Sequence, residues 1–181
     1  PEPFLLVIFH PVRTEADKAG RQARYLFEIL DKRPERKFAI YPNNAPGAEA
    51  ILFELRRFER AQGWTIRPNL ATLEYVGAMS HAAAMVGNSS AGFVEAPFFN
   101  LPMLHIGNRN LDRQHAGNVT FVDFDEPDII RALDKARTPA ERTRVAALQN
   151  PYGDGHAGGR VADLLVSYAE HPEVLRKMVT Y

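Results

Sequence analysis

Short apolar runs alternate along the chain with longer amphipathic stretches of helical length. The apolar runs predict strands at Phe4 to Phe9, Lys37 to Tyr41, Ala84 to Val86, Pro102 to Ile106 and Asn118 to Phe121. The amphipathic stretches predict helices at about Ala16 to Leu30, Ala48 to Gln62, Leu73 to Ser80, Gly92 to Pro97, Pro127 to Lys135 and Ala157 to Tyr168. Strands that alternate with crossover helices are typical of a parallel sheet. The pattern therefore predicts a doubly wound α/β domain.

The length and composition fit one well-packed domain without a disulfide framework. With 181 residues, 45% of them hydrophobic, we expect residues 1–181 to form a single domain. The 22 Lys and Arg residues balance 22 Asp and Glu residues, which argues against attraction to nucleic acid or an anionic membrane. The sequence contains no cysteine and no apolar run of the roughly 18 residues that a membrane span needs. We expect a cytoplasmic protein that would bind a phosphate group through local contacts.

A predicted strand, a polar turn and a helix start follow one another around residue 87, where the chain reads Gly87-Asn88-Ser89-Ser90-Ala91-Gly92. Small residues let main-chain N–H groups approach an anion, hydroxyls add donors, and the helix dipole favours negative charge. This pattern indicates a phosphate site at Ser89, Ser90 and Gly92, and the alternative is that a serine caps the helix. Glu95, about one turn further, would accept hydrogen bonds from ribose hydroxyls, or it is a solvated helix residue.

The loop after the strand Pro102 to Ile106 carries two arginines four residues apart. It reads Gly107-Asn108-Arg109-Asn110-Leu111-Asp112-Arg113. Because guanidinium is permanently charged and offers several donors, Arg109 and Arg113 are candidates for binding phosphate oxygens. Pairing with surface carboxylates is the alternative for each of them.

Two further strand ends carry polar groups that suit a phosphate or a hydroxyl. His10 ends the first strand, and Asn43 lies in the turn after the second strand. Each has an ordinary structural explanation, as a hydrogen-bonded histidine and as a turn asparagine. Ligands of open parallel sheets bind beyond the carboxyl ends of the strands, so four such strand ends together indicate one binding site. The spacing of the remaining histidines indicates no metal site.

Taken in this order, these segments resemble the C-terminal half of hydrolysing UDP-N-acetylglucosamine 2-epimerases. The resemblance covers about residues 4 to 168 and also includes Phe9-His10-Pro11, Tyr41-Pro42-Asn43, Gly117-Asn118-Val119 and Asn150-Pro151-Tyr152-Gly153-Asp154-Gly155. The non-hydrolysing enzymes usually show His-Arg-Arg-Glu at the first segment and Asp-Ser-Gly-Gly at the phosphate turn, and neither occurs here. The chain departs from the hydrolysing pattern at Asn110, Asp112 and His156, which makes Arg113 the weakest of the matched positions.

The resemblance implies a glycosyltransferase-B-like architecture, in which two Rossmann-like domains hold the substrate between them. This chain would be the UDP-binding half, and the N-terminal half, with its acid and base carboxylates, would be absent. The chain begins at Pro1 without an initiator methionine, which is expected of a segment of a longer protein. The matched positions imply these roles: Ser89, Ser90 and Gly92 at the diphosphate, Glu95 at the ribose hydroxyls, Arg109 and Arg113 at the phosphates, Asn43 along the nucleotide, and His10 at the reacting end.

The implied reaction needs no metal or cofactor. It eliminates UDP between C1 and C2 of the sugar, which leaves a glycal, and water then adds to give free N-acetylmannosamine, as in sialic acid synthesis. His10 would either protonate the departing phosphate or hydrogen bond to it. Two other functions stay open, the donor-nucleotide domain of a glycosyltransferase with the same architecture and a non-catalytic UDP-sugar binding module. The sequence also leaves open a diacetamido sugar as the substrate and a homo-oligomeric assembly.

Overall fold

The computed structural model describes residues 3–169, 171 and 173. By its internal contacts the chain divides into two compact units, Pro1–Gln149 and Asn150–Tyr181. The larger unit contains strands β1 (Phe4–Ile8), β2 (Arg36–Ile40), β3 (Trp64–Arg67), β4 (Ala84–Gly87), β5 (Met103–Ile106) and β6 (Val119–Val122), helices α1 (Ala19–Asp31), α2 (Ala48–Arg56), α3 (Thr72–His81), α4 (Ala91–Val94), α5 (Glu126–Ala136) and α6 (Pro139–Ala146), and the 3₁₀ helices η1 (Arg13–Glu15) and η2 (Ala96–Phe99). The smaller unit contains helix α7 (Ala157–Ala169). The single domain expected over residues 1–181 stays a prediction.

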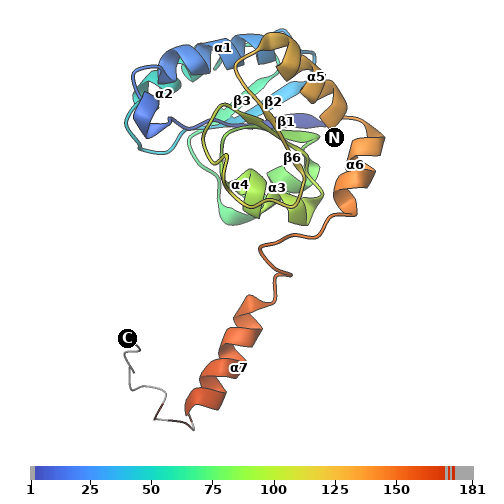
Figure 1. Ribbon diagram of the computed structural model, residues 1–181. Helices are drawn as coiled ribbons and strands as arrows, with labels where there is room; N and C mark the ends of the chain where they lie inside the picture. Colours follow the sequence, from blue (N-terminus) through green and yellow to red (C-terminus); the bar gives the residue numbers. More distant parts are fainter. Residues whose placement is uncertain (1–2, 170, 172, 174–181) are drawn as a thin grey trace. The chain divides into compact units, whose positions relative to one another are not determined.

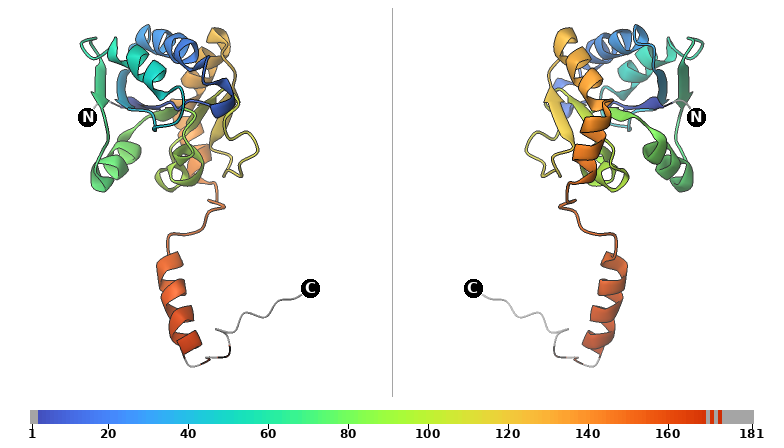
Figure 2. Two further views of the ribbon diagram at one scale, coloured as in Figure 1. Left: turned by 90° about the vertical axis from the view of Figure 1, so that its left-hand side faces the viewer. Right: turned by 90° about the vertical axis from the view of Figure 1, so that its right-hand side faces the viewer.

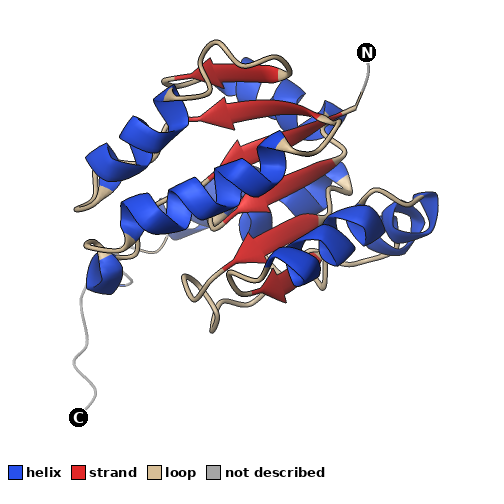
Figure 3. Cartoon of the chain, turned by 90° about the horizontal axis from the view of Figure 1, so that it is seen from above, coloured by secondary structure: helices blue, strands red, loops and turns tan. Residues whose placement is uncertain are grey.

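The six strands form one parallel sheet in the order β3-β2-β1-β4-β5-β6. Figure 3 shows the strand arrows running side by side in the same direction. This is the order of a Rossmann-like sheet, and its direction of progression reverses between β1 and β4. The doubly wound parallel sheet predicted from the sequence is therefore confirmed.

Helices cover both faces of the sheet, with α1, α2 and α5 on one face and α3 and α4 on the other (Figures 1 and 2). Strand β1 shows why its sequence is apolar without interruption. Leu5 and Val7 belong to the core beneath the first group of helices, whereas Leu6 and Ile8 belong to the core beneath the second. Successive side chains point to opposite faces, so a central strand with both faces covered has no solvent-facing position.

One strand and one α-helix of the structure were not predicted, and neither was the short 3₁₀ helix η1. Strand β3 has only four residues and lies at the edge of the sheet, and only Trp64 in it is buried, so its apolar signal is weak. Helix α6 buries only Glu141 and Val145 and is otherwise polar. Neither sequence therefore carries the periodicity on which the other elements were recognised. No helix in the described part of the chain is long and apolar enough to cross a membrane.

Two predicted helices are shorter in the structure because 3₁₀-type turns replace the α-helix before its predicted end. The helix expected from Ala48 to Gln62 ends at Arg56, after which the N–H groups of residues 57 and 58 donate to the carbonyls of residues 54 and 55. The helix expected from Gly92 to Pro97 is the single turn α4 followed by η2, which has Pro97 in its first turn. Proline lacks an N–H group and its ring would clash with the carbonyl four residues earlier, so it ends the α-helix there.

Candidate functional site

The candidate site begins where β1 and β4 lie next to each other at the reversal of strand order. Their last paired residues are Ile8 and Gly87, and His10 and Ser89 each follow two positions later. The backbones approach so closely here that a Cβ on Gly87 would lie 2.0 Å from the Ile8 carbonyl oxygen, and Gly87 has a φ of +134°. Only glycine fits this backbone without strain. The ends of β1 and β4, which the sequence analysis expected to share one binding site, therefore lie side by side in the structure.

Asn88 connects the two strand ends through its side chain. Its Oδ1 accepts a hydrogen bond from the main-chain N–H of His10 at 2.7 Å, and its Nδ2 donates to the His10 carbonyl at 2.8 Å. The Asn88 carbonyl in turn accepts hydrogen bonds from Arg109 Nη1 at 2.8 Å and from Asn110 Nδ2 at 3.0 Å. Asn88 thus contacts both His10 and Arg109, although the sequence analysis gave it no role.

The imidazole of His10 is half-buried, and one of its nitrogens is occupied. The main-chain N–H of Asn43 donates to His10 Nδ1 at 3.1 Å, so a neutral ring carries its proton on Nε2. Burial, and secondly the positive charge of Arg109, lower the pKa of His10 from 6.5 to about 4. His10 is therefore neutral at pH 7 in the unliganded chain, with Nε2–H as its available donor. The contact comes from the backbone of Asn43, whose side chain is exposed.

Arg109 is half-buried and has no carboxylate partner among the residues that the structure describes. Burial, and secondly the neighbouring charge of Arg113, lower the pKa of Arg109 from 12.5. Arginine nevertheless stays charged at neutral pH, so this strand end carries positive charge that is not neutralised. The alternative of a surface ion pair, which the sequence left open, is not what the structure shows for Arg109. Arg113 itself is exposed, and its main-chain N–H donates to the Asn110 carbonyl at 3.1 Å.

The serine turn presents one buried and one half-buried hydroxyl. Ser89 is buried, and its Oγ accepts from the main-chain N–H of Ala91 at 3.4 Å. Ser90 occupies the N-cap position of α4, but its side chain makes no capping hydrogen bond. Gly92 lies against Met103, because a Cβ on Gly92 would be 1.5 Å from the Met103 sulfur. Helix α4 has only four residues, so its dipole supports an anion less than the sequence pattern predicted.

Glu95 lies at the exposed end of α4, apart from the His10 and Arg109 contacts. Its charge acts on Tyr75 of α3, whose pKa is raised to about 12 by burial and secondly by the negative charge of Glu95. No described cation forms a salt bridge with Glu95, so its carboxylate oxygens are available as acceptors. Glu95 thus lies near α3, whereas Arg113 lies in the loop after β5.

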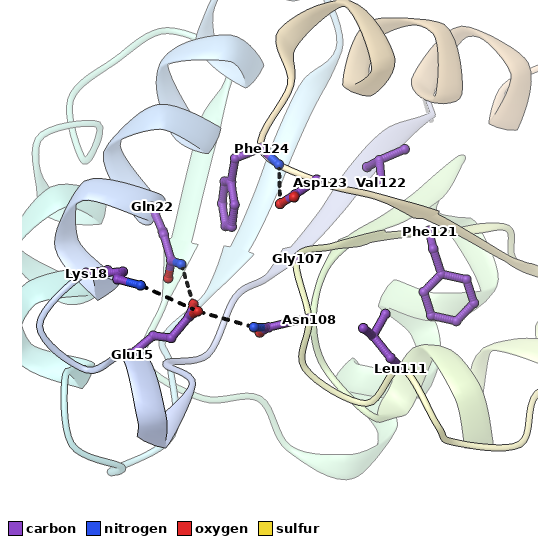
Figure 4. A pocket seen from close by; sticks show the side chains of 10 residues that line it. All are labelled: Glu15, Lys18, Gln22, Gly107, Asn108, Leu111, Phe121, Val122, Asp123 and Phe124. Atoms are coloured by element: carbon purple, nitrogen blue, oxygen red, sulfur yellow. Dashed lines mark hydrogen bonds and ion pairs between the residues drawn. The ribbon is translucent and has the colours of Figure 1, made fainter.

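A cavity of about 400 Å³ borders the arginine loop but contains none of the predicted residues (Figure 4). Its polar wall is formed around Glu15, which accepts hydrogen bonds from Gln22 Nε2 at 2.7 Å and from Asn108 Nδ2 at 3.2 Å. Lys18 lies 3.8 Å from the same carboxylate. The hydrogen bond from Gln22, followed by the charge of Lys18, lowers the pKa of Glu15. The contact with Asn108 holds the start of the arginine loop close to η1.

The order of the strands and the polar groups at the reversal point define the class of protein. The chain is a Rossmann-like α/β domain, and this fold is found in one half of glycosyltransferase-B-like enzymes. Within that class the chain belongs to the UDP-N-acetylglucosamine 2-epimerase family, whose family model matches residues 1–166.

Two curated relatives support this family, a solved structure shows the same fold, and all three matches show how much of these relatives the chain spans. The chain is 33% identical over 135 residues to the UDP-N-acetylglucosamine 2-epimerase of Neisseria meningitidis serogroup B, a match that covers 75% of this chain and 36% of the relative. It is 27% identical over 176 residues to the hydrolysing UDP-N,N'-diacetylbacillosamine 2-epimerase of Legionella pneumophila, covering 97% and 46%. The crystal structure of the Neisseria meningitidis UDP-GlcNAc 2-epimerase bound to UDP-GlcNAc superposes with a TM-score of 0.69 at 19% identity, covering 91% and 45%. The chain thus spans less than half the length of these relatives.

Proposed function

We propose that this chain is the UDP-binding half of a hydrolysing UDP-N-acetylglucosamine 2-epimerase. Family membership supports epimerase chemistry, and the name of the Legionella relative supports the hydrolysing type. The observation that carries the proposal is the pair formed by a charged Arg109 and a neutral His10 on either side of Asn88, at the reversal point of the sheet. A cation and a neutral hydrogen-bond donor that lie at neighbouring strand ends suit a diphosphate leaving group.

The proposed nucleotide lies along the carboxyl ends of the strands. The main-chain N–H groups and hydroxyls of Ser89 and Ser90 donate to phosphate oxygens. Arg109 stays held at the Asn88 carbonyl through Nη1 and binds the same group with its remaining N–H groups. Glu95 accepts from the ribose hydroxyls on the α3 side. Arg113 is exposed and acts as a more distant positive charge. These roles follow the positions implied by the family resemblance and the access that each side chain has in the structure.

The proposed chemistry is an elimination followed by a hydration. A base takes the proton from C2 while the bond between C1 and the phosphate oxygen breaks, which gives a 2-acetamidoglycal and UDP. Water then adds across the double bond with the opposite configuration at C2, and the product is free N-acetylmannosamine. Negative charge develops on the departing diphosphate, so donors already directed at it lower the barrier. The base belongs to the remaining half of the enzyme.

His10 serves in this scheme as a hydrogen-bond donor. With a pKa of about 4 and Nδ1 occupied by the Asn43 N–H, the ring offers Nε2–H to the phosphate oxygen. A neutral imidazole is a weak acid, so the hydrogen bond, more than a full proton transfer, stabilises the leaving group. The main-chain N–H of Asn43 therefore determines which nitrogen of His10 can donate, and a sequence pattern does not show such a contact.

The test is to incubate the complete protein with UDP-N-acetylglucosamine in heavy water. We expect free UDP and N-acetylmannosamine with deuterium at C2, because the C2 proton is removed and a solvent hydron is returned. A glycosyltransferase would release UDP only with an acceptor and leave C2 unlabelled, and a binding module would release nothing. A diacetamido substrate, tested in parallel, would show whether the Legionella relative is the better guide to the sugar.

A further inference from the structure

We infer that Asn88 is a positioning residue that fixes the His10 imidazole and the Arg109 guanidinium in one arrangement, ready for the same leaving group. The inference rests on the proposed function, but its first test does not need a ligand. Neither the family roles implied by the sequence nor the serine turn assigns anything to Asn88. The role is inferred from the hydrogen-bond partners of Asn88 in the structure.

All four polar groups of Asn88 are used, and none of them by a sequence neighbour. Its main-chain N–H donates to the Ile8 carbonyl at 3.2 Å, and its side chain makes both bonds to the His10 main chain. Its carbonyl accepts from Arg109 and Asn110. Asn88 itself is 1% exposed, and its bonds to the half-buried His10, Arg109 and Asn110 are partly buried. Asn88 therefore joins the ends of β1, β4 and β5.

These partners distinguish Asn88 from an ordinary turn asparagine. A turn asparagine bonds with the backbone about two residues further on, whereas the side-chain partner of Asn88 lies 78 residues away. The paired bonds hold both the N–H and the carbonyl of His10, which fixes the backbone that carries the ring. The ring then lies where its Nδ1 meets the Asn43 N–H at 3.1 Å. Asn88 thus sets the position of the imidazole, and through it the nitrogen that carries the proton.

The role requires a side chain that donates and accepts at the same time. Aspartate has the same shape, but it would place a carboxylate oxygen against the His10 carbonyl, where Nδ2 now lies at 2.8 Å. Its charge would also compete with the main-chain carbonyl for Arg109. Alanine removes both side-chain bonds without adding a charge. The two substitutions therefore disrupt the arrangement in different ways, and both are informative.

The first experiment measures the ring-nitrogen ¹⁵N chemical shifts of His10 in this chain without ligand. We expect the wild type to show one neutral form, with the proton on Nε2, and Asn88→Ala and Asn88→Asp to lose this single-form signature. Asn118→Ala is the matched control, because Asn118 is also 1% exposed and its Nδ2 donates to the carbonyls of Gly92 and Leu101. This control should lower the melting temperature and leave the His10 shifts unchanged. His10 shifts that stay wild-type in a folded Asn88 variant would overturn the inference.

The second experiment measures UDP binding by titration calorimetry with the same proteins. We expect Asn88→Ala to weaken binding by about tenfold, since the His10 segment is no longer tied to the residue 88 backbone that holds Arg109. A wild-type chain that binds no UDP would count against the proposed function, while the chemical-shift result for Asn88 would stand. A wild type that binds UDP, with Asn88 variants that bind it equally well, would refute the positioning role alone. If Asn88→Ala does not fold, Asn88→Asp supplies both measurements.

Discussion

At the scale of single residues, the candidate site is held together by hydrogen bonds between strand ends that lie far apart in the sequence. His10 and Arg109 were predicted because each follows an apolar run, and parallel strands end at one edge of the sheet. Asn88 was visible only as a member of a small polar turn. Its partners are separated from it by 78, 21 and 22 residues, and no local pattern encodes such contacts. Asn110, a departure from the family pattern, likewise acquires a role only through its bond to Asn88.

The first prediction concerns the charge state of His10. In the unliganded chain its pKa is about 4, and a bound diphosphate places negative charge beside the ring. An opposite charge favours the protonated form, so UDP should raise the His10 pKa by about one unit or more. By linkage, UDP affinity then increases as the pH falls from the bound-state pKa towards 4, and it is unaffected by His10 well above that range. NMR titration of the ring with and without UDP measures both values.

His81, which is exposed at the end of α3, is the internal control for this titration. The ring chemical shifts of His81 should not respond to UDP. If UDP binds and the two histidines respond alike, His10 does not lie at the phosphate.

The second prediction concerns Glu95, for which ribose binding and simple solvation give different results. Glu95→Gln should weaken UDP binding by about one to two decades, because a carboxylate accepts from both ribose hydroxyls and an amide does so with one oxygen only. The stability of the fold should change by less than about 0.5 kcal/mol, since the side chain is exposed. Calorimetric titration with UDP and with 2′,3′-dideoxy-UDP separates the cases. The substitution should matter for the first nucleotide and hardly for the second, and an equal loss for both would remove Glu95 from the ribose site.

At the scale of elements, the strength of the apolar signal decided what was predictable. Strands β1, β4 and β5 are buried along nearly their whole length, and the sequence predicted each of them to within two residues. Strand β3 and helix α6 have too few buried positions to stand out. The interruption between α4 and η2 at Pro97 was also missed, although proline is a signal for it. Burial therefore makes an element easier to predict, although the edge strand β6, in which only Val119 is buried, was predicted as well.

The third prediction tests the packing of α4 against β5. A methyl group on Gly92 would overlap the Met103 sulfur, whose side chain is flexible, whereas one on Gly87 would overlap the Ile8 carbonyl of the backbone. Gly92→Ala should therefore lower the free energy of unfolding by about 1–3 kcal/mol, the usual cost of overpacking. The double variant with Met103→Ala should be less destabilised than the sum of the two single substitutions.

Gly87→Ala is the comparison for this double substitution. Its obstacle is backbone and its φ is positive, so Met103→Ala should give it no recovery. Urea denaturation of the single and double variants measures all of these differences. Recovery that is equal for both glycines would mean that the contact with Met103 is not what requires Gly92.

At the scale of the whole molecule, alternation of strands and helices was enough to predict the class of fold. A parallel sheet needs crossover helices, and right-handed crossovers place them on opposite faces when the strand order progresses in opposite directions from the centre, so few other arrangements suit this sequence. The chain covers 36% and 46% of its curated relatives, which agrees with the proposal that it is one half of a two-domain enzyme. The assembly of the complete protein and its cytoplasmic location stay predictions. Both depend on surface residues and on chain segments that the pattern of buried apolar residues does not describe.

The last prediction is that the chain ending at Gln149 folds by itself with a melting temperature within about 4 °C of the 181-residue chain. Both hydrophobic cores consist of residues of the larger unit, and α7 contains no buried residue. A second truncation after Ala136 should melt at a clearly lower temperature, because it removes α6, in which Val145 is 2% exposed and Arg144 donates to the Gly117 carbonyl. Trp64, the only tryptophan, lies buried in β3 and reports the unfolding of the sheet by fluorescence in all three chains. If the chain ending at Gln149 lacks a cooperative Trp64 transition, residues 150–181 stabilise the sheet and the single domain predicted over residues 1–181 is the correct description.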